Sequence, residues 1–405
     1  MKLIFKALSV FLFVLCIPVF QAVIYAAAEL PDEVSISESE TVDLGSIFFE
    51  EKREPIRTVS AGYGALEYNS KIMALKVVPV KDIKVNVTKR RYVSPGGEIF
   101  GIKLYTKGII VISVDSVTTP SGNSDPALEA GIKCGDIITT IDSVAATSAQ
   151  QMTDAIENSG GNSLRLRIDR NGETIDTVLT PVMSVNGKYK AGLWVRDSSA
   201  GIGTITFYDD SAEMFAGLGH GVCDVDTGKI MPLDNGEAVR AKVNGFYKSS
   251  AGNPGELCGV FSDVALGSLR VNHEMGVYGS LLQPSCKKIM PVALESEVRI
   301  GKAQMIATID ENGPQYYDIE ITKIYPSSDL SARNMIIQVT DPILLEKTGG
   351  IVQGMSGSPI VQNSMLVGAV THVFVNSPEK GYAIFAQRML GTMDSVKSSD
   401  YAKAS

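Results

Sequence analysis

The pattern of apolar and polar positions divides the chain into segments with different expected structures. Residues 7–28 form an uncharged, mostly apolar run that is long enough to cross a bilayer. Lys2 and Lys6 precede this run and three alanines precede Glu29, so residues 1–28 fit either a membrane anchor or a cleaved signal peptide. Both alternatives predict that the rest of the chain is exported.

Residues 29–91 predict a tether followed by a small β-rich segment. The stretch 29–54 is acidic and rich in serine, which is typical of a tether. Residues 72–80 are mostly apolar, and residues 83–87 then alternate between apolar and polar, as in a half-buried strand. This pattern indicates no chemistry for the segment.

The pattern between residues 92 and 183 mixes strands with two short helices. Two apolar strands, 96–104 and 108–117, are followed by a one-turn helix at 125–131, with a proline at its first position and a glycine at its exit. A second helix begins at the capping box that Ser148 forms with Gln151. An Arg-Asn-Gly-Glu hairpin turn then joins two alternating strands.

This order of elements resembles a PDZ domain of the bacterial, circularly permuted kind. The resemblance is carried by the segment AGIKCGDII, residues 130–138, and by the five residues at the place of the PDZ carboxylate-binding loop: Phe100, Gly101, Ile102, Lys103 and Leu104. It implies that backbone N–H groups of this loop hold a peptide carboxylate and that the adjacent strand edge pairs with the peptide. Lys103 stands where many such loops carry a second glycine, so an internal loop or strand is an alternative ligand. A rigid spacer without a ligand is the other alternative.

Residues 184–405 predict a domain of short antiparallel strands. Glycines are frequent and no long helical pattern appears, which indicates a barrel or a sandwich. Residues 192–207 predict a strand, a tight turn at residues 201–203 and a second strand.

Composition narrows the classes of function. Of the 405 residues, 44% are hydrophobic and 20% are charged, which is typical of a globular protein. The net charge of -8 argues against nucleic acid as a partner, because phosphate binding needs a basic face. The cysteines beyond the N-terminal run show no metal-ligand spacing, so we expect no zinc site and interpret them as unpaired core thiols: Cys134, Cys223, Cys258 and Cys286.

The segment GGIVQGMSGSPIVQ, residues 349–362, places Ser356 in a glycine-rich turn. A nucleophilic serine needs an exposed turn, a base within reach and donors for the oxyanion. The segment matches the G-x-S-G-x-P turn of chymotrypsin-like peptidases, with Ser358 where those enzymes have glycine, and residues 360–370 follow as a strand. The backbone N–H groups of Gly354 and Ser356 are the candidate oxyanion donors. A structural role for Ser356 in the turn is the alternative.

The chain contains three histidines, and one of them fits the role of a general base. His220 lies between Gly219 and Gly221, where a turn can present the imidazole. His273 and His372 are interpreted as packed or surface residues.

Asp341 is the candidate for the carboxylate that holds the imidazole in its active tautomer. The same residue, followed by Pro342, is also a good N-cap for a short helix over residues 343–347. Spacing gives the two roles equal weight. Asp224 and Asp226 are the alternatives for the orienting carboxylate.

Two long motifs, GLGHGVCDVDTG and GGIVQGMSGSPIVQNSMLVGAVTHVFVN, resemble the stage IV sporulation protein B family, the sporulation serine peptidases of endospore-forming bacteria. The resemblance runs from the N-terminal anchor to the end of the chain. It implies that His220 is the general base, Ser356 the nucleophile and Asp341 the orienting carboxylate. The expected fold is mainly β with short helices: a PDZ domain, residues 92–183, followed by a serine peptidase domain, residues 184–405, related to the chymotrypsin-like enzymes. The gap between Asp341 and Ser356 is shorter than usual in those enzymes.

The resemblance also implies a biological setting. Members of the family are exported across the forespore membrane and act in the space between forespore and mother cell, either held by the N-terminus or released after cleavage. They cleave themselves and a membrane-bound regulator of an intramembrane protease, which then activates a late mother-cell sigma factor. The implied partners are this regulator, a peptide ligand of the PDZ domain and the membrane, with no nucleic acid, metal or other cofactor.

Two other functions fit parts of the sequence. One is a non-catalytic PDZ adaptor that binds membrane partners and uses a peptidase-like domain as its scaffold. The other is a cysteine peptidase that uses Cys223. The presence of both His220 and Ser356 on glycine-flanked turns favours a serine endopeptidase, because a scaffold needs neither residue.

Overall fold

A computed structural model of the chain describes Gln21 and residues 33–37, 49–53, 59–61, 65–74, 78–325 and 332–404. The expected anchor or signal peptide lies outside the described residues, apart from Gln21. No helix within the described ranges is long and apolar enough to span a bilayer. The chain separates into two compact units: Met1–Arg91 with Pro291–Val298, and Tyr92–Met290 with Arg299–Ser405.

The first unit contains a small sheet with strand order β1-β5-β4-β2, and β3 pairs with β4. Its strands are β1 (Glu33–Ser37), β2 (Phe49–Arg53), β3 (Val59–Ala61), β4 (Ala65–Ala74) and β5 (Val78–Thr88), and the 3-10 turn η1 (Glu295–Glu297) follows later in the chain. A small apolar core is formed by Tyr68, Ile72, Ile83 and Val85. β1 and β2 lie within residues 29–54, so the described parts of the expected tether are strands. The apolar alternation of the sequence EVSIS in β1 satisfies the strand period despite the many serines.

Six strands of the second unit close into a first antiparallel barrel in the order β7-β18-β19-β20-β17-β16, because β16 also pairs with β7. They are β7 (Ile99–Val114), β16 (Leu193–Asp209), β17 (Met214–Gly217), β18 (Leu233–Tyr247), β19 (Glu256–His273) and β20 (Gly276–Leu281). β6 (Tyr92–Pro95) pairs with β16, and β21 (Met290–Pro291) follows the barrel. The barrel core includes Phe100, Ile102, Leu104, Ile205, Phe215 and Val277.

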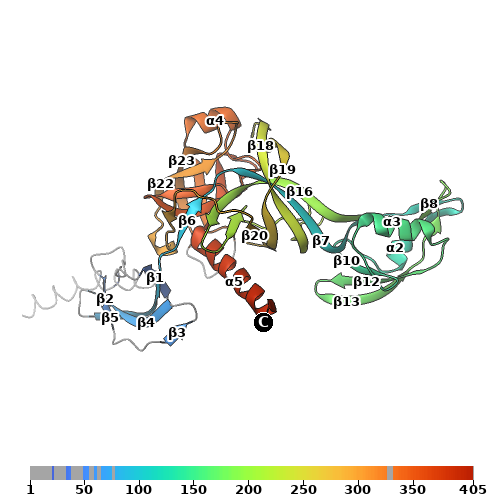
Figure 1. The fold of residues 1–405 in the computed structure, drawn as a ribbon, viewed down its shortest axis with the longest axis horizontal. Coiled ribbons are helices and arrows are strands. Elements are labelled where there is room, and N and C mark those ends of the chain that lie inside the picture. The colour runs from blue at the N-terminus through green and yellow to red at the C-terminus, as the bar shows by residue number, and fades with distance from the viewer. Residues whose placement is uncertain are drawn as a thin grey trace, which may run out of the picture. The chain divides into compact units, whose positions relative to one another are not determined.

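A second closed barrel has the strand order β22-β23-β24-β27-β26-β25. Its strands are β22 (Gly301–Ala307), β23 (Gln315–Ile324), β24 (Met335–Val339), β25 (Pro359–Gln362), β26 (Met365–Val373) and β27 (Lys380–Phe385). Helix α4 (Pro342–Thr348) lies in the connection from β24 to β25, and helix α5 (Ala386–Ala404) packs against β26 and β27 (Figure 1). Two six-stranded antiparallel barrels are the arrangement of chymotrypsin-like peptidases, and the mainly β fold confirms the fold class expected from the sequence.

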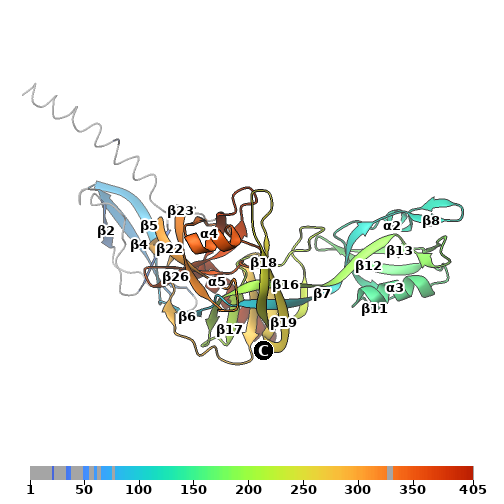
Figure 2. The same ribbon diagram turned by 90° about the horizontal axis from the view of Figure 1, so that it is seen from above.

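A separate module, residues 108–197, is inserted into the first barrel. It contains the second half of β7 and the first residues of β16. The elements between them are β8 (Val117–Thr119), β9 (Gly122–Ser124), α2 (Pro126–Glu129), β10 (Ile137–Ile141), β11 (Val144–Ala145), α3 (Ala149–Asn158), β12 (Leu164–Arg170), β13 (Glu173–Leu179), β14 (Val182–Met183) and β15 (Tyr189–Lys190). The inserted module has its own core, which includes Ile109, Val111, Ile138, Met152, Leu166 and Ile168. Figures 1 and 2 show that β7 and β16 run together from the barrel into the module.

This insertion changes the domain boundary expected at Tyr92. The first half of β7 pairs with β16 and β18 of the barrel, so residues 92–106 belong with the peptidase strands. The chain leaves the barrel at Thr106, whose hydroxyl donates to the carbonyls of Gly108 and Asp197. The peptidase fold is therefore made from residues on both sides of the inserted module.

Several local predictions for the inserted module agree with the structure. The Ser148 hydroxyl accepts the N–H of Gln151 at 3.1 Å and caps α3, while the Gln151 side chain accepts the N–H of Thr147. Asn171 and Gly172, with φ of 56° and 88°, form the hairpin turn between β12 and β13. Short-range hydrogen bonds thus determine where α3 begins, and positive φ values determine where the hairpin turns.

The expected carboxylate-binding loop at Phe100–Leu104 is wrong. These residues lie in the first half of β7 and pair with β16 on one edge and with β18 on the other, so no edge is open to a peptide. Gly101 is required by packing, because a Cβ there would lie 2.7 Å from the Phe261 ring and 2.8 Å from Val239. The glycine that suggested a loop is a site of close side-chain approach in a barrel strand.

The tight turn expected at residues 201–203 is also wrong, since β16 continues without a break from Leu193 to Asp209. A Cβ on Gly203 would lie 2.1 Å from the side chain of Leu218. This glycine lets the chain before His220 pack directly on β16.

Candidate active site

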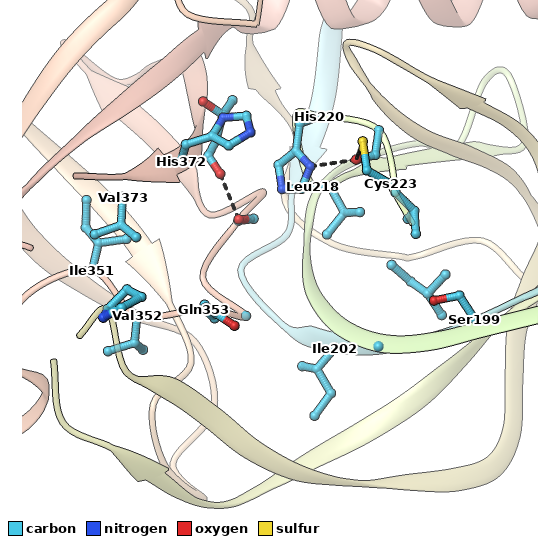
Figure 3. A pocket seen from close by; sticks show the side chains of 18 of the residues that line it. Ser199, Ile202, Leu218, His220, Cys223, Ile351, Val352, Gln353, His372 and Val373 are labelled. Atoms are coloured by element: carbon cyan, nitrogen blue, oxygen red, sulfur yellow. Dashed lines mark hydrogen bonds between the residues drawn. The ribbon is translucent and has the colours of Figure 1, made fainter. Parts of the chain in front are cut away.

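A cavity of about 600 Å³ is lined by residues from both barrels. The first barrel contributes His220 and the apolar side chains of Ile202 and Leu218, and the second contributes Ser356 and Val352. Figure 3 shows His220 and Leu218 on one side of this cavity and the segment Ile351–Gln353 on the other. The mostly apolar walls and the few polar groups are typical of a ligand-binding site.

His220 is presented by a tight bend at the end of β17. Leu218 and Gly219 have φ of 65° and 68°, and a Cβ on Gly219 would lie 3.0 Å from the side chain of Thr371. Nδ1 of His220 lies 2.8 Å from the carbonyl oxygen of Gly221, to which it can donate a hydrogen bond. That bond places the proton on Nδ1 and leaves Nε2 as the acceptor that a general base needs.

Desolvation lowers the pKa of His220, although the hydrogen bond to the Gly221 carbonyl acts in the opposite direction. The neutral imidazole is therefore favoured near neutral pH. A neutral ring with a free Nε2 is the form that can accept a proton from a serine hydroxyl.

The Ser356 turn is fixed to the first barrel by three hydrogen bonds. The Thr204 N–H donates to the Ser356 carbonyl at 2.9 Å, and the Thr204 hydroxyl donates to the Gly354 carbonyl at 2.8 Å. The Thr206 hydroxyl donates to the Gly357 carbonyl at 2.8 Å. Strand β16 thus holds the turn from one side.

Gly357 brings the serine turn and the histidine bend into contact. Its φ is +95°, and a Cβ at this position would lie 2.0 Å from the Thr204 carbonyl and 2.5 Å from the Leu218 nitrogen. Any larger residue would separate the two segments that carry Ser356 and His220. This explains physically why a glycine follows the serine.

The backbone around Ser356 can supply an oxyanion hole. Within the part of the chain that the structure describes, the N–H groups of Gly354 and Ser356 donate no hydrogen bond, whereas those of Met355 and Gly357 donate to Val352 and Val370. Two unsatisfied donors two residues apart on a nucleophile turn are suited to a developing negative charge. The arrangement is consistent with the donors predicted from the sequence.

The hydroxyl of Ser356 donates to the carbonyl of Thr371 at 2.8 Å. His220 makes its hydrogen bond to Gly221, so each candidate catalytic side chain contacts a backbone carbonyl in this structure. The two residues line one cavity without a hydrogen bond between them among the described contacts. The segments that carry His220 and Ser356 thus meet at one cavity.

Asp341 does not hold the imidazole of His220 in this structure. Its Oδ1 accepts the N–H groups of Ile343 and Leu344 at 2.9 and 3.0 Å, and its Oδ2 accepts the N–H of Asp318 at 3.2 Å. Asp341 is the N-cap of α4, and it does not line the cavity that contains His220. Spacing left two roles open for Asp341, and in this structure the residue has the capping role.

The alternative carboxylates, Asp224 and Asp226, both pair with Arg196 of β16. The Asp224 side chain is buried and also accepts the N–H groups of Asp226 and Thr227. Burial acts to raise the pKa of Asp224, but the Thr227 N–H and the Arg196 guanidinium outweigh it and hold this pKa below its ordinary value. These carboxylates stabilise the loop that follows His220.

Cys223 lines the cavity, but its surroundings do not favour a thiolate. Desolvation and the negative charge of Glu274 raise the pKa of the Cys223 thiol. Its sulfur faces the Gly221 carbonyl at 3.8 Å. The cysteines were expected in the core, yet three of the four described cysteines are exposed, and all four are free.

His372 and Thr371 line the cavity, although neither residue was predicted to have a functional role. The ring centroids of His220 and His372 are 4.7 Å apart, and Figure 3 shows the two rings side by side. The sequence signal was the proximity of the motif THVFVN to the serine turn. His372 was interpreted as a packed or surface residue, because its strand position alone does not indicate which face it occupies.

Comparisons with families of known proteins match two stretches of the chain. The model of the SpoIVB peptidase S55 family matches residues 187–390, and the model of the PDZ domain matches residues 81–180. A curated relative, the regulator of sigma E protease of Haemophilus influenzae, is 35% identical over 80 residues. These residues are 20% of this chain, which spans only 17% of the length of that relative.

Solved structures with some similarity include a PDZ domain and two proteases. The PDZ domain of the SdrC-like protein from Listeria monocytogenes is 24% identical, with a TM-score of 0.19, over 22% of this chain and 87% of that one. The active form of the Rv3671c protease from M. tuberculosis is 12% identical, with a TM-score of 0.30, over 49% of this chain and 74% of that one. The HtrA-type protease AlgW with a tripeptide is 14% identical, with a TM-score of 0.31, over 49% of this chain and 56% of that one.

The peptidase model covers both barrels from β16 onward, and the PDZ model covers most of the inserted module. The match to the peptidase family covers half of the 405 residues. The chain therefore belongs to the SpoIVB peptidase S55 family, and it is a serine peptidase with a PDZ domain.

Proposed function

We propose that the protein is an endopeptidase in which Ser356 is the nucleophile and His220 the general base. Nε2 of His220 takes the proton of the Ser356 hydroxyl while Oγ forms a bond to the peptide carbonyl carbon. The N–H groups of Gly354 and Ser356 hold the oxyanion. The histidine then gives its proton to the leaving amine as the C–N bond breaks, and water releases the acyl group by the reverse sequence.

The observation that carries this proposal is the meeting of His220 and Ser356 in one cavity from two separate barrels. The tautomer set by the Gly221 carbonyl leaves Nε2 free, and the two N–H groups of the serine turn are available. A scaffold without catalysis would need none of these features. The hydroxyl of Ser356 must rotate away from the Thr371 carbonyl for the reaction to begin.

We propose that the PDZ domain regulates cleavage through strand β16. This strand begins in the inserted module, which carries most of the PDZ match, at Leu193; it lines the cavity at Ser199 and Ile202 and holds the serine turn through Thr204. Arg196, at the junction, pairs with the loop that follows His220. A peptide that shifts the start of β16 would act on both catalytic segments through continuous backbone and an ion pair.

The finer proposal is that the enzyme is exported into the space between forespore and mother cell, cleaves itself, and cleaves a membrane-bound regulator of an intramembrane protease. It rests on the resemblance of the two site motifs and the uncharged run at residues 7–28. Self-cleavage would change the protein from a membrane-associated form to a released form. The substrate is then a protein held at the same membrane surface.

Fragment masses test the activity and the self-cleavage together. Wild-type protein, Ser356→Ala and His220→Ala are incubated under identical conditions, and their masses are followed with time. We expect wild-type protein to lose its N-terminal segment and both variants to stay full length, with rate losses on the order of 10^4-fold. Cleavage of Ser356→Ala at the wild-type rate would show that another protease makes the cut.

A further inference from the structure

A glycine in strand β16 has no evident structural role. Gly201 does not adopt a positive φ, and beyond its chain neighbours no described atom would lie within 4 Å of a Cβ added to it. A glycine inside a strand weakens the strand, because it adds no side-chain packing and loses more conformational freedom on folding. Such a glycine often marks a place where a ligand or another backbone approaches closely. Gly201 lines the active-site cavity, so a ligand in that cavity can approach it.

The space beside Gly201 is a recess in the cavity wall. Side chains two residues apart on a strand share a face, so Ser199, Gly201 and Gly203 face the same way. At Gly203 a Cβ would lie 2.1 Å from the Leu218 side chain, which therefore occupies the face there. At Gly201 the described residues leave the face free, while Leu218 and Ile102, the partner of Gly201 on β7, both line the cavity. The recess is thus bounded by aliphatic side chains.

The backbone of β16 beside the recess is also open to a partner. Between Leu193 and Gly203 the strand pairs with β7 on one edge, and no described strand pairs with its other edge. That edge carries the N–H of Thr204, which donates to the Ser356 carbonyl. Backbone groups two residues apart on a strand point to the same edge, so those of Ile202, which lines the cavity, point there as well. An extended peptide can add to such an edge through its main chain.

The recess lies on the histidine side of the cavity. Leu218 precedes His220 in the bend after β17, and Figure 3 shows the two side chains next to each other. The wall formed by Ile351 and Val352, which lead into the serine turn, lies on the other side. In the proposed mechanism His220 donates a proton to the leaving amine. The part of the substrate that follows the cleaved bond is therefore the part nearest to the recess.

We propose that this recess is a specificity site for an aliphatic side chain of the substrate, carried by one of the first two residues after the cleaved bond, and that Gly201 sets its size. The inference rests on the proposed function. The substrate lies extended along the free edge of β16, and its side chain enters beside Ile102 and Leu218. Removal of this side chain from water stabilises the bound substrate.

Cleavage-site profiles of Gly201→Val test this role. Wild-type protein and the variant are incubated with a peptide library of mixed sequence, and the cut positions are read by mass spectrometry. We expect wild-type protein to favour Val, Leu or Ile at one of the first two positions after the cut. In Gly201→Val the added side chain fills the recess. For peptides with an aliphatic residue at that position, kcat/KM should fall about 10–200-fold, the range found when an apolar pocket changes by a methylene group. The profile should shift toward Gly, Ala and Ser.

Two measurements separate this role from damage to the fold or to the catalytic pair. The urea midpoint of Gly201→Val should not fall, since Val is favoured in strands and displaces no described atom. A small organophosphonate does not extend into the recess, so it should label Ser356 at the wild-type rate.

Gly245→Val is the matched control. Gly245 is a strand glycine of β18 that also has no described atom within 4 Å of an added Cβ, and it does not line the cavity. This control should keep the wild-type cleavage profile. If Gly201→Val does not fold, Gly201→Ala takes its place, with a smaller shift of the profile in the same direction.

Three results would overturn the inference. The first is a folded Gly201→Val with the wild-type profile. The second is a change confined to positions before the cut, which would place the recess on the acyl side. The third is wild-type protein that reacts with the organophosphonate but shows no aliphatic preference after the cut, or cuts none of the peptides. Failure of the proposed function is distinguishable from these results, because Ser356 of wild-type protein would then not react with the organophosphonate at all.

Discussion

Asp341 can act as a catalytic carboxylate or as a helix cap, and the two roles predict very different properties for its variants. In Asp341→Ala, the N–H groups of Ile343 and Leu344 lose the acceptor that lies 2.9 and 3.0 Å away. In Asp341→Asn, the side chain keeps a capping oxygen and loses only its charge. Both variants leave His220, Ser356 and the cavity between them unchanged.

The contacts of Asp341 set the expected size of the stability change. Loss of an N-cap lowers the free energy of unfolding by about 1 kcal/mol, within a range of roughly 0.5–2 kcal/mol. The bond from the Asp318 N–H to Oδ2, at 3.2 Å, adds at most about 1 kcal/mol, since water can replace a partner at the surface. We expect Asp341→Ala to lose about 1–2 kcal/mol. Asp341→Asn should lose well under about 1 kcal/mol, because only the charge at the helix N-terminus is removed.

The two measurements are urea unfolding and steady-state cleavage of a peptide substrate, with Ser356→Ala as the inactive reference. The capping role predicts that kcat of both Asp341 variants stays within about threefold of wild type at temperatures where they are folded. An orienting carboxylate would predict a loss on the order of 10^4-fold, which is about 5.5 kcal/mol in the activation free energy. A fully folded Asp341→Asn whose kcat has fallen more than about 10²-fold would refute the capping role.

Three further predictions follow from contacts beyond Asp341. Arg196→Gln removes the partner of the buried Asp224 carboxylate. This variant should lower the free energy of unfolding by about 1–3 kcal/mol and reduce kcat. An unchanged urea midpoint and an unchanged kcat would contradict the prediction. Gly101→Val should destabilise the first barrel by about 1–3 kcal/mol because its side chain would enter occupied space, and equal unfolding midpoints for variant and wild type would contradict it. Burial lowers the pKa of His220 and lowers that of His372 to about 4, so both histidines bind protons more readily in the unfolded chain. The free energy of unfolding should therefore fall as the pH drops from about 6.5 to 4. A free energy of unfolding that stays constant over this range would contradict the prediction.

The sequence was sufficient to predict the elements that depend on local chemistry. The glycines around Ser356 and His220 indicated turns, and the structure places both turns at one cavity, with the two side chains half-buried rather than exposed. The cap at Ser148 and the hairpin at residues 171–172 were also predictable, because short-range hydrogen bonds and positive φ values determine them. Such features need no information about distant partners.

The features that the sequence could not predict depend on long-range pairing. The glycine at position 101 suggested a loop, yet it is required by the Phe261 side chain, which is 160 positions away in the chain. Residues 360–370 suggested one strand, but Asn363 and Ser364 adopt φ of 51° and 61° and form the hairpin turn between β25 and β26. The bulge that brings His372 to the cavity exists only in the register between β26 and β27.

Asp341 shows the opposite limit of sequence reasoning. Spacing gave its two roles equal weight and the family resemblance implied the catalytic one, but the carboxylate accepts two N–H groups at the start of α4 and the N–H of Asp318. In this structure the carboxylate accepts these N–H groups and does not line the cavity that contains His220. The local alternative was visible in the sequence, but only the contacts could decide between the two roles.

The central claim, that Ser356 is a nucleophile activated by His220, is tested most directly by covalent labelling. Purified wild-type protein is treated with an organophosphonate that reacts with activated serines, and the modified residue is mapped by mass spectrometry. We predict a single modification at Ser356, none in Ser356→Ala and strongly slowed labelling in His220→Ala. Labelling of another residue, or labelling of Ser356 at the same rate in wild-type protein and His220→Ala, would contradict the claim.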